Sequence, residues 1–317
     1  MQILAEPSDT QELARERLRR PSSLPISVIV PVRNEAHNLA KCLGSLRDFD
    51  EIYVVDSQST DSTAQLATSF GAQVVQFQYR GGWPKKRQWA LDTLPLRHEW
   101  VLLLDADEAL TPEIIAEMKT VVSDPGIDGY YVGLEMFFLG KRLRHSGATF
   151  YKLSLFRRGK GRFECRTQDQ DSFMCDMEVH EHVIVEGQTR NLAEPLVHHN
   201  VESLFRYIQK HNDYSNWEVQ VWNDGGSAGL EPALFGNQAQ RRRWLRKKLF
   251  RLPGSPALFF LYKYVLRLGF LDGIPGLIYC GFQAIQFFHI KAKLYESRIS
   301  STRFAPAQHC DLSLSKD

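Results

Sequence analysis

Two carboxylates follow a strongly apolar run near the end of the first third of the chain. Residues 100–108 read W-V-L-L-L-D-A-D-E. The five apolar residues are typical of a strand buried on both faces, as in a parallel sheet covered by helices. Side chains at positions i and i+2 of extended backbone point the same way, so Asp105 and Asp107 are expected to face one divalent cation or one polyhydroxyl ligand. The structural alternative is that Asp105 ends the strand and Asp107 or Glu108 caps a loop.

Three earlier segments have the apolar pattern of strands, and a helical pattern follows each. The strands are predicted at 26–30, 51–55 and 72–77, and the helices at about 36–47, 62–70 and 85–94. Strand and helix therefore alternate four times in about a hundred residues, which predicts a parallel sheet of right-handed βαβ units. A further helix is predicted to start at Thr111-Pro112-Glu113, with proline in its first turn.

Polar residues stand at the carboxyl ends of three of these strands. Glu35 follows the first strand, Asp56 the second, and Asp105 with Asp107 the fourth. The carboxyl ends of parallel strands form one crevice, where α/β sheets bind ligands, and a nucleotide is the expected occupant. The chain has neither G-x-G-x-x-G nor G-x-x-x-x-G-K-[ST], so the dinucleotide fingerprint and the P-loop are excluded as the explanation.

The composition bounds the class of protein. The chain has 317 residues, enough for a large core, and a formal net charge of +2, which gives no general argument for nucleic-acid binding. Its five cysteines are odd in number and lack a C-x-x-C spacing, which favours reduced thiols in the cytosol. The first twenty residues lack the apolar core of a secretory signal, so no export is expected.

The C-terminal third combines a basic run with apolar segments. Residues 241–251 read R-R-R-W-L-R-K-K-L-F-R, and apolar segments follow at 256–271 and 274–290. The second segment is marginal in length for a bilayer span. These features favour helices that lie in the membrane interface, held by the basic run against anionic lipid. The alternative is a buried helical subdomain whose basic run is merely solvated. Before this region, strands are expected at 129–138 and 153–157, and an amphipathic helix at 201–222.

Three motifs together resemble the family 2 glycosyltransferases of the GT-A fold. They are P-V-R-N-E at 31–35, V-V-D-S-Q-S-T-D-S-T at 54–63 and L-D-A-D-E at 104–108, and the resemblance covers about residues 26–200. H-E-H-V at 180–183, L-V-H-H-N at 196–200 and G-F-L-D-G-I-P-G at 269–276 resemble the bacterial subgroup that includes lipopolysaccharide core β-glucosyltransferases. The implied fold is a Rossmann-like, mostly parallel sheet flanked by helices, with a C-terminal helical, membrane-associating extension.

The resemblance implies a nucleotide-diphosphate sugar donor, a UDP-sugar above all, together with Mn²⁺ or Mg²⁺ and inversion at the anomeric carbon. Carried over by position, Pro31 and Glu35 line the nucleoside pocket, and Asp56 hydrogen-bonds the base, uracil in a UDP-sugar. Asp105 faces the ribose or the sugar, and Arg87, which follows Lys85 and Lys86, lies near the diphosphate.

The same resemblance assigns the metal ligands. Asp107 binds the cation that bridges the diphosphate, and His198 stands where related enzymes present a further metal or diphosphate contact, with the adjacent His199 as the alternative. A metal held by Asp107 would stabilise the charge that builds on the leaving diphosphate, which makes Asp107 a catalytic residue as well.

An inverting transfer also needs a base that accepts the proton of the acceptor hydroxyl. Glu181 is predicted to be this base because it lies between two histidines; Glu178 and Asp176 are the other candidates. A surface strand with alternating charges would have a similar sequence. His145 and Arg157 could contact substrate, but His145 is interpreted as a structural histidine and Arg157 as a surface arginine.

The chain is accordingly predicted to consist of a leader (1–24), a catalytic GT-A domain (25–225), a membrane-associating helical region (226–300) and a tail (301–317). A lipid-linked, lipopolysaccharide or exopolysaccharide acceptor is expected at the cytoplasmic face of the inner membrane, which residues 241–290 would contact. Two other functions are considered. A non-catalytic nucleotide-sugar binder or membrane scaffold would keep the fold without turnover, and a nucleotidyltransferase would also use paired carboxylates on a nucleotide-binding sheet.

Overall fold

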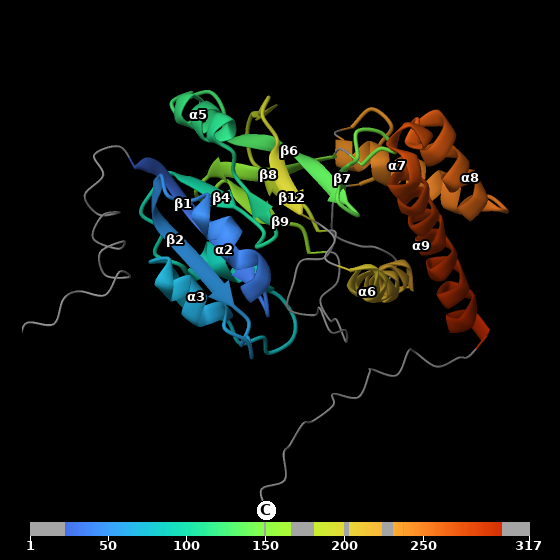
Figure 1. Ribbon diagram of the computed structural model, residues 1–317, viewed down its shortest axis with the longest axis horizontal. Coiled ribbons are helices and arrows are strands. Elements are labelled where there is room, and N and C mark those ends of the chain that lie inside the picture. Colours follow the sequence, from blue (N-terminus) through green and yellow to red (C-terminus); the bar gives the residue numbers. More distant parts are fainter. Residues whose placement is uncertain are drawn as a thin grey trace, which may run out of the picture.

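The computed structural model describes residues 23–148, 150–165, 181–199, 203–223, 231–236 and 238–299. These residues form a mixed sheet flanked by helices, and the helices of the C-terminal third gather on the side of the molecule away from strands β1 and β2 (Figure 1). The α/β fold class and the helical C-terminal region predicted from the sequence are both confirmed. The leader and the tail lie largely outside the described residues.

The first half of the sheet is parallel, as predicted. Its strands are β1 (Leu24–Val32), β2 (Phe49–Asp56), β3 (Gln73–Gln76) and β4 (Trp100–Leu103), in the spatial order β3-β2-β1-β4. The connecting helices are α2 (Ala36–Gly44), α3 (Thr63–Ser69) and α4 (Lys86–Thr93). The chain moves outward from β1 to β3 and then returns to place β4 on the other side of β1. The switch point of the sheet, where α/β proteins bind ligands, therefore lies between β1 and β4.

The second half of the sheet is mixed. Strand β8 (Phe150–Arg157) runs antiparallel to both β4 and β6 (Gly129–Phe138). Strand β12 (Leu196–His199) runs parallel to β6 and antiparallel to the short β5 (Glu108–Ala109). Two short strands, β7 (Lys141–Arg142) and β11 (Thr189–Asn191), flank β6, and β9 (Gly161–Phe163) pairs with β10 (Val183–Val185) in a separate hairpin. This arrangement carries residues near 198 back to the end of β4.

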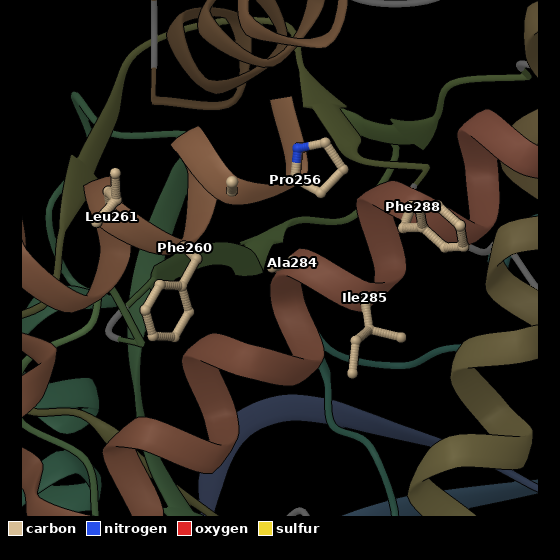
Figure 2. Close-up of a pocket in the computed structure, with 7 residues that line it drawn as sticks. Pro256, Phe260, Leu261, Ala284, Ile285 and Phe288 are labelled. Atoms are coloured by element: carbon tan, nitrogen blue, oxygen red, sulfur yellow. The ribbon is translucent and has the colours of Figure 1, made fainter. Parts of the chain in front are cut away.

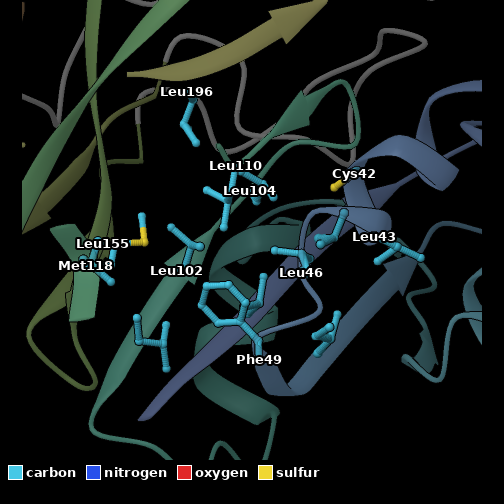
Figure 3. Close-up of a cluster of buried hydrophobic side chains, with 14 of the residues drawn as sticks. Cys42, Leu43, Leu46, Phe49, Leu102, Leu104, Leu110, Met118, Leu155 and Leu196 are labelled. Atoms are coloured by element: carbon cyan, nitrogen blue, oxygen red, sulfur yellow. The ribbon is translucent and has the colours of Figure 1, made fainter. Parts of the chain in front are cut away.

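The main core lies between the sheet and helices α2 and α5 (Pro112–Val121). Leu39, Leu43 and Leu46, which the helical pattern places on one face, are each 0% exposed. They pack with residues from β4, α5, β8 and β12, including Leu102 and Met118 (Figure 3). Because apolar side chains of both sheet halves meet here, this core fixes the position of the strand ends that carry the polar residues.

The ends of two helices differ in how well the sequence predicted them. Thr111 accepts a hydrogen bond from the amide of Ile114 and Pro112 occupies the first turn of α5, as predicted. Asparagine is a common helix cap, but Asn34, which lies just before α2, does not cap that helix. Asn34 has a positive φ of 55°, which asparagine tolerates, and its side-chain oxygen accepts a hydrogen bond from the amide of Thr60 at 2.8 Å. It therefore joins the loops that follow β1 and β2.

The C-terminal region contains α6 (Leu204–Asn223), α7 (Gln238–Phe250), α8 (Ser255–Leu261), a π-helical turn (Tyr262–Leu266), a 3₁₀ turn (Gly269–Asp272) and α9 (Gly273–Ile299). The second apolar helix thus extends nine residues beyond its predicted end. Within the described residues no single helix has the length and apolar character of a membrane span, and one bent pair, Ser255–Leu266 with Gly269–Ile299, meets those criteria across a 71° bend.

Candidate functional site

Asp107 and His198 are 91 positions apart in the chain and meet at the end of β4. The Nε2 atom of His198 lies 3.0 Å from Oδ2 of Asp107. The pairing of β12 with β5 places His198 opposite Glu108, and its pairing with β6 places it beside Met136. The structure thus brings together the two residues that the sequence resemblance assigns to a metal. The side chain of the alternative ligand, His199, lies outside the described part of the chain.

The two side chains perturb each other's proton affinity. Burial raises the pKa of Asp107, but the charge of His198 and its hydrogen bond together lower that pKa by a larger amount, so the net shift is downward. Burial lowers the pKa of His198, and the Asp107 carboxylate outweighs this effect and raises it. The Nδ1 atom of His198 is buried and has no hydrogen-bond partner within the described residues. A carboxylate and an imidazole held together in this way form a compact pair of candidate ligands.

The pair fits a divalent cation that shares its coordination with a diphosphate. Two ligands at right angles on a Mg²⁺-sized ion are about 3 Å apart, because each metal–ligand bond is roughly 2.1 Å long. The distance between His198 and Asp107 is 3.0 Å. No group of three or more His, Cys, Asp or Glu side chains suited to a metal occurs in the described residues. Phosphate oxygens and water would have to fill the other positions, which is how Mg²⁺ is usually bound.

Asp105 is held by two cationic side chains. Arg87 forms an ion pair with Oδ1, and Lys152 Nζ lies 3.0 Å from Oδ2. Lys152 also contacts Glu108 at 2.6 Å. Burial raises the pKa of Asp105, but the charges of Arg87 and Lys152 lower it well below its ordinary value. Sequence reasoning missed Lys152, although a single lysine within the apolar strand F-Y-K-L-S-L-F is a signal that could have identified it.

The nucleoside side of the crevice is formed by the ends of β1 and β2. Pro31 is buried in β1 and lies opposite Val55 of β2. The side chain of Asp56 is 1% exposed and accepts hydrogen bonds from Ser59 and, at 2.9 Å, from Gln76. The structure therefore places the predicted base contact in a rigid, prearranged position at the strand end.

Glu35, which follows β1, lies near enough to Asp107 for the two carboxylates to influence each other. Burial raises its pKa, Asn38 opposes the rise through a hydrogen bond of 2.9 Å, and the charge of Asp107 adds to it. Lys210 of α6 is exposed, and its charge lowers the pKa of both Glu35 and Asp107. Sequence analysis did not select Lys210, because only the fold brings α6 to this crevice.

The first residues of α4 point inward in three directions. Lys85 Nζ pairs with Glu181 at 2.9 Å, Lys86 Nζ donates to the carbonyl of Val32 at 2.9 Å, and Arg87 reaches Asp105. The side chains of Lys85 and Lys86 are fully buried. Of the three cations, Arg87 is therefore the one that reaches the predicted sugar-facing aspartate, while the two lysines tie the helix to the sheet and to the segment after residue 180.

Glu181 does not have the environment expected of a catalytic base. Its side chain is 0% exposed and its carboxylate is neutralised by Lys85. A base must reach the acceptor hydroxyl directly or through one water molecule, and a fully buried ion pair prevents this in the present conformation. The alternative considered from the sequence, a surface strand with alternating charges, does not fit Glu181 either, because its side chain is buried. The other candidates, Asp176 and Glu178, lie outside the described residues.

Two further residues make contacts within the protein, and the Arg157 side chain, which was expected at the surface, is only 15% exposed. His145 Nδ1 lies 3.1 Å from Asp272 of the C-terminal region. Arg157 contacts Glu99 and donates to the carbonyl of Ile127 at 3.0 Å. Neither side chain is directed to the Asp107–His198 pair in these contacts.

Comparison with known proteins gives a consistent result. Residues 27–182 match the model of glycosyl transferase family 2. The chain is 27% identical over 293 residues to the lipopolysaccharide core biosynthesis glycosyltransferase LpsC of Rhizobium meliloti, covering 88% of this chain and 95% of that protein. It is 26% identical over 287 residues to an uncharacterized glycosyltransferase of Rickettsia conorii, covering 87% of this chain and 92% of the relative.

Among solved structures, the mannosyltransferase PcManGT of Pyrobaculum calidifontis, in complex with GDP-Man and Mn²⁺, aligns with a TM-score of 0.49 and 16% identity over 89% of this chain and 92% of its own. The family match covers β1 to β4 and the crevice between them, and the match to the Rhizobium meliloti relative covers a larger share of the chain, 88%. This protein is therefore a glycosyltransferase whose residues 27–182 form a family 2 domain, and over most of its length it resembles an enzyme of lipopolysaccharide core biosynthesis.

Proposed function

We propose that this enzyme transfers a hexosyl group, with inversion at the anomeric carbon, from a UDP-sugar to a lipid-linked or lipopolysaccharide-type glycan at the cytoplasmic face of the membrane. The observation that carries the proposal is the contact of 3.0 Å between Asp107 and His198 at the switch point of the sheet. It supplies two ligands for Mn²⁺ or Mg²⁺ where a donor diphosphate would lie.

The donor would bind across the ends of β1, β2 and β4. Pro31 and Glu35 would line the nucleoside pocket, and Asp56 would accept a hydrogen bond from the uracil ring. Asp56 is already held by Ser59 and Gln76, so it can bind the base without losing side-chain freedom on binding. Asp105 would accept a hydrogen bond from a hydroxyl of the ribose or the sugar, and its own orientation is maintained by Arg87 and Lys152.

In the transfer, an oxygen of the acceptor forms a bond to the anomeric carbon while the bond from that carbon to the diphosphate breaks. The bonding electrons pass to the diphosphate, and the acceptor proton passes to a base. Asp107 and His198 would hold the cation, which would supply Lewis-acid stabilisation of the leaving group. Arg87 and the exposed Lys210 add positive charge on the same side, which favours a departing anion.

Glu181 remains the residue predicted to act as the base, and Asp176 and Glu178 remain the alternatives. For Glu181 to accept a proton, its ion pair with Lys85 would have to open when the acceptor binds. Because opening would break a buried ion pair, it would cost free energy that acceptor binding has to offset.

The acceptor would be presented at a lipid surface by the C-terminal helices. Large apolar side chains are exposed along α8, the following turns and α9, among them Leu266 (73% exposed), Ile274 (73%) and Phe288 (60%). Arg241 and Lys247 of the adjacent α7, and Arg251 just after it, are also exposed. An apolar face with basic residues beside it suits an anionic membrane interface.

An open apolar groove of about 520 Å³ lies on this face. It is lined by Pro256, Phe260 and Leu261 from α8 and by Ala284, Ile285 and Phe288 from α9 (Figure 2). The hydrocarbon chain of a lipid would fill such a groove and remove its apolar lining from water, at about 25 cal/mol per Å² buried. A lipid chain in this groove would hold the protein at the membrane surface, which favours a peripheral or monotopic membrane protein.

The donor, the metal and the catalytic function are tested by one assay. Release of nucleoside diphosphate is measured from UDP-, GDP- and dTDP-sugars with Mn²⁺, with Mg²⁺ and with a chelator, and Asp107→Asn is the matched control of nearly equal shape. We expect slow hydrolysis of a UDP-sugar that requires the cation and is lost in the variant. Equal turnover with chelator would contradict the metal assignment, and silence even with membrane lipid extract as acceptor would favour the non-catalytic scaffold.

A further inference from the structure

At the junction of the sheet domain and the C-terminal helices, a buried lysine has no acidic partner among the residues that the structure describes. Lys263, in the π-helical turn, is 9% exposed. Its Nζ atom lies 5.6 Å from the ring centre of Phe259 and 5.1 Å from that of Tyr279. No carboxylate forms an ion pair with it in the described parts of the chain. An ammonium group in this position has lost most of its water without gaining a counter-charge.

The charged groups closest to Lys263 are also cationic. The side chains of Arg267 and Lys263 both lie beside Gly147, in the loop before β8. A Cβ atom placed on Gly147 would be 3.4 Å from Arg267 Nε and 3.8 Å from Lys263 Nζ. Arg242 of α7 stacks over Phe150 at 6.0 Å, and its charge acts on Lys263 as well. Arg242 and Arg267 are exposed, which places two guanidinium groups at the rim above a buried ammonium.

Nearby carboxylates are already engaged elsewhere. Asp272 accepts hydrogen bonds from the backbone amides of Arg144 and His145 and, at 2.9 Å, from Ser146 Oγ. Glu218 pairs with Arg246, another cation whose charge reaches Lys263. Burial lowers the pKa of Lys263 to about 8, and the charges of Arg242, Arg267 and Arg246 contribute to the decrease. Lys263, Arg242 and Arg267 form a basic cluster. This cluster therefore carries excess positive charge that an anion would offset.

The cluster is also connected to the catalytic crevice. Tyr279, beneath Lys263, contacts Phe138 of β6 with ring centres 5.7 Å apart. Phe138 lies two residues beyond Met136, the β6 residue paired with His198. Arg267 lies against the loop that follows β7, since its carbonyl accepts a hydrogen bond from the amide of Ser146 at 2.9 Å. An anion bound here would be close enough to belong to the second substrate.

We propose that Lys263, Arg242 and Arg267 bind a phosphate group of the acceptor substrate. This inference rests on the proposed function, because it assumes an acceptor other than water. Two guanidinium groups and one ammonium group match the charge and the several acceptor oxygens of a phosphate. The phosphate is either a lipid headgroup in the membrane or a water-soluble phosphate ester on the glycan, and both present the same chemistry to the cluster.

The test measures phosphate binding by the full-length protein without donor and with chelator present. One probe is vesicles of phosphatidylcholine containing phosphatidic acid, compared with phosphatidylcholine alone, and the other is glucose 6-phosphate in solution. We expect Lys263→Met and Arg267→Gln each to weaken binding at least tenfold, or about 1.4 kcal/mol, because each removes a charge-assisted contact. Lys119→Met, a lysine of α5 that is 47% exposed and pairs with Asp48, is the matched control and should change binding less than twofold.

The two probes separate the sources of phosphate. Loss with vesicles alone identifies a lipid phosphate, and loss with the sugar phosphate identifies a phosphorylated glycan. Lys263→Met should unfold at a temperature no lower than the wild type, since methionine replaces an uncompensated buried charge with an apolar chain of similar length. The proposal would be overturned if Lys263→Met and Arg267→Gln bound both probes with unchanged affinity. It would also be overturned if the wild type bound neither probe. Donor hydrolysis is measured separately, so its failure would contradict only the proposed function.

Discussion

Replacing Glu181 by glutamine removes one partner of a buried ion pair. The Lys85 and Glu181 charges are 2.9 Å apart and both side chains are 0% exposed. Loss of one partner leaves an ammonium group without a counter-charge in the protein interior, which costs about 3–5 kcal/mol. Because 1 kcal/mol lowers the melting temperature of a chain of this size by about 2–4 °C, the expected decrease is on the order of 10 °C.

The assay is thermal and urea unfolding of the wild type, Glu181→Gln, and the double variant Lys85→Met with Glu181→Leu. The double variant replaces the ion pair by apolar side chains of similar volume and is expected to recover most of the lost stability. If Glu181→Gln unfolds within about 1 kcal/mol of the wild type, the ion pair does not stabilise the fold and the argument from its burial is refuted.

The double variant also separates stability from catalysis. General-base catalysis contributes about 10²–10⁴-fold to the rate, so a stable double variant should lose at least a hundredfold in sugar transfer if Glu181 is the base. Transfer within tenfold of the wild type would mean that Glu181 is a structural residue and would direct attention to Asp176 and Glu178. Nucleoside diphosphate release without acceptor serves as the control for an intact donor site.

Three further results are expected. Mn²⁺ with UDP should raise the melting temperature of the wild type by several degrees and leave that of Asp107→Asn unchanged; equal shifts in calorimetry would exclude Asp107 as a ligand. The folded-state pKa of Lys263, about 8, lies below its ordinary 10.5, so the folded protein binds fewer protons between these values and its stability should rise with pH there. Lys263→Met should accordingly be more stable than the wild type by about 3 kcal/mol below pH 8, and the gain should vanish near pH 10.5 in urea unfolding; a gain independent of pH would contradict the lowered pKa. Phe288→Asp should reduce co-sedimentation with anionic vesicles at least fivefold, whereas equal co-sedimentation would remove the apolar face from the membrane contact.

Much of the parallel half-sheet is visible in the sequence, because each strand is a short apolar run and each following helix has its own periodicity. The run at 100–104 predicted β4, and the spacing of Leu39, Leu43 and Leu46 predicted the buried face of α2. These patterns are local, since burial on both faces of a strand and on one face of a helix leaves a signature within a few residues. The three motifs at the strand ends were sufficient to predict the enzyme family.

Only the tertiary structure decided which charged side chains pair when they lie far apart in the sequence. Asp107 meets His198 across 91 positions, and Glu181 meets Lys85 across 96, which turns a candidate base into a buried ion-pair partner. Lys152 and Lys263 likewise gained their surroundings only when distant elements packed together. A side chain's charge state and access to substrate depend on every group within a few ångströms, and the neighbours that decide them come from elements whose contact no local pattern encodes.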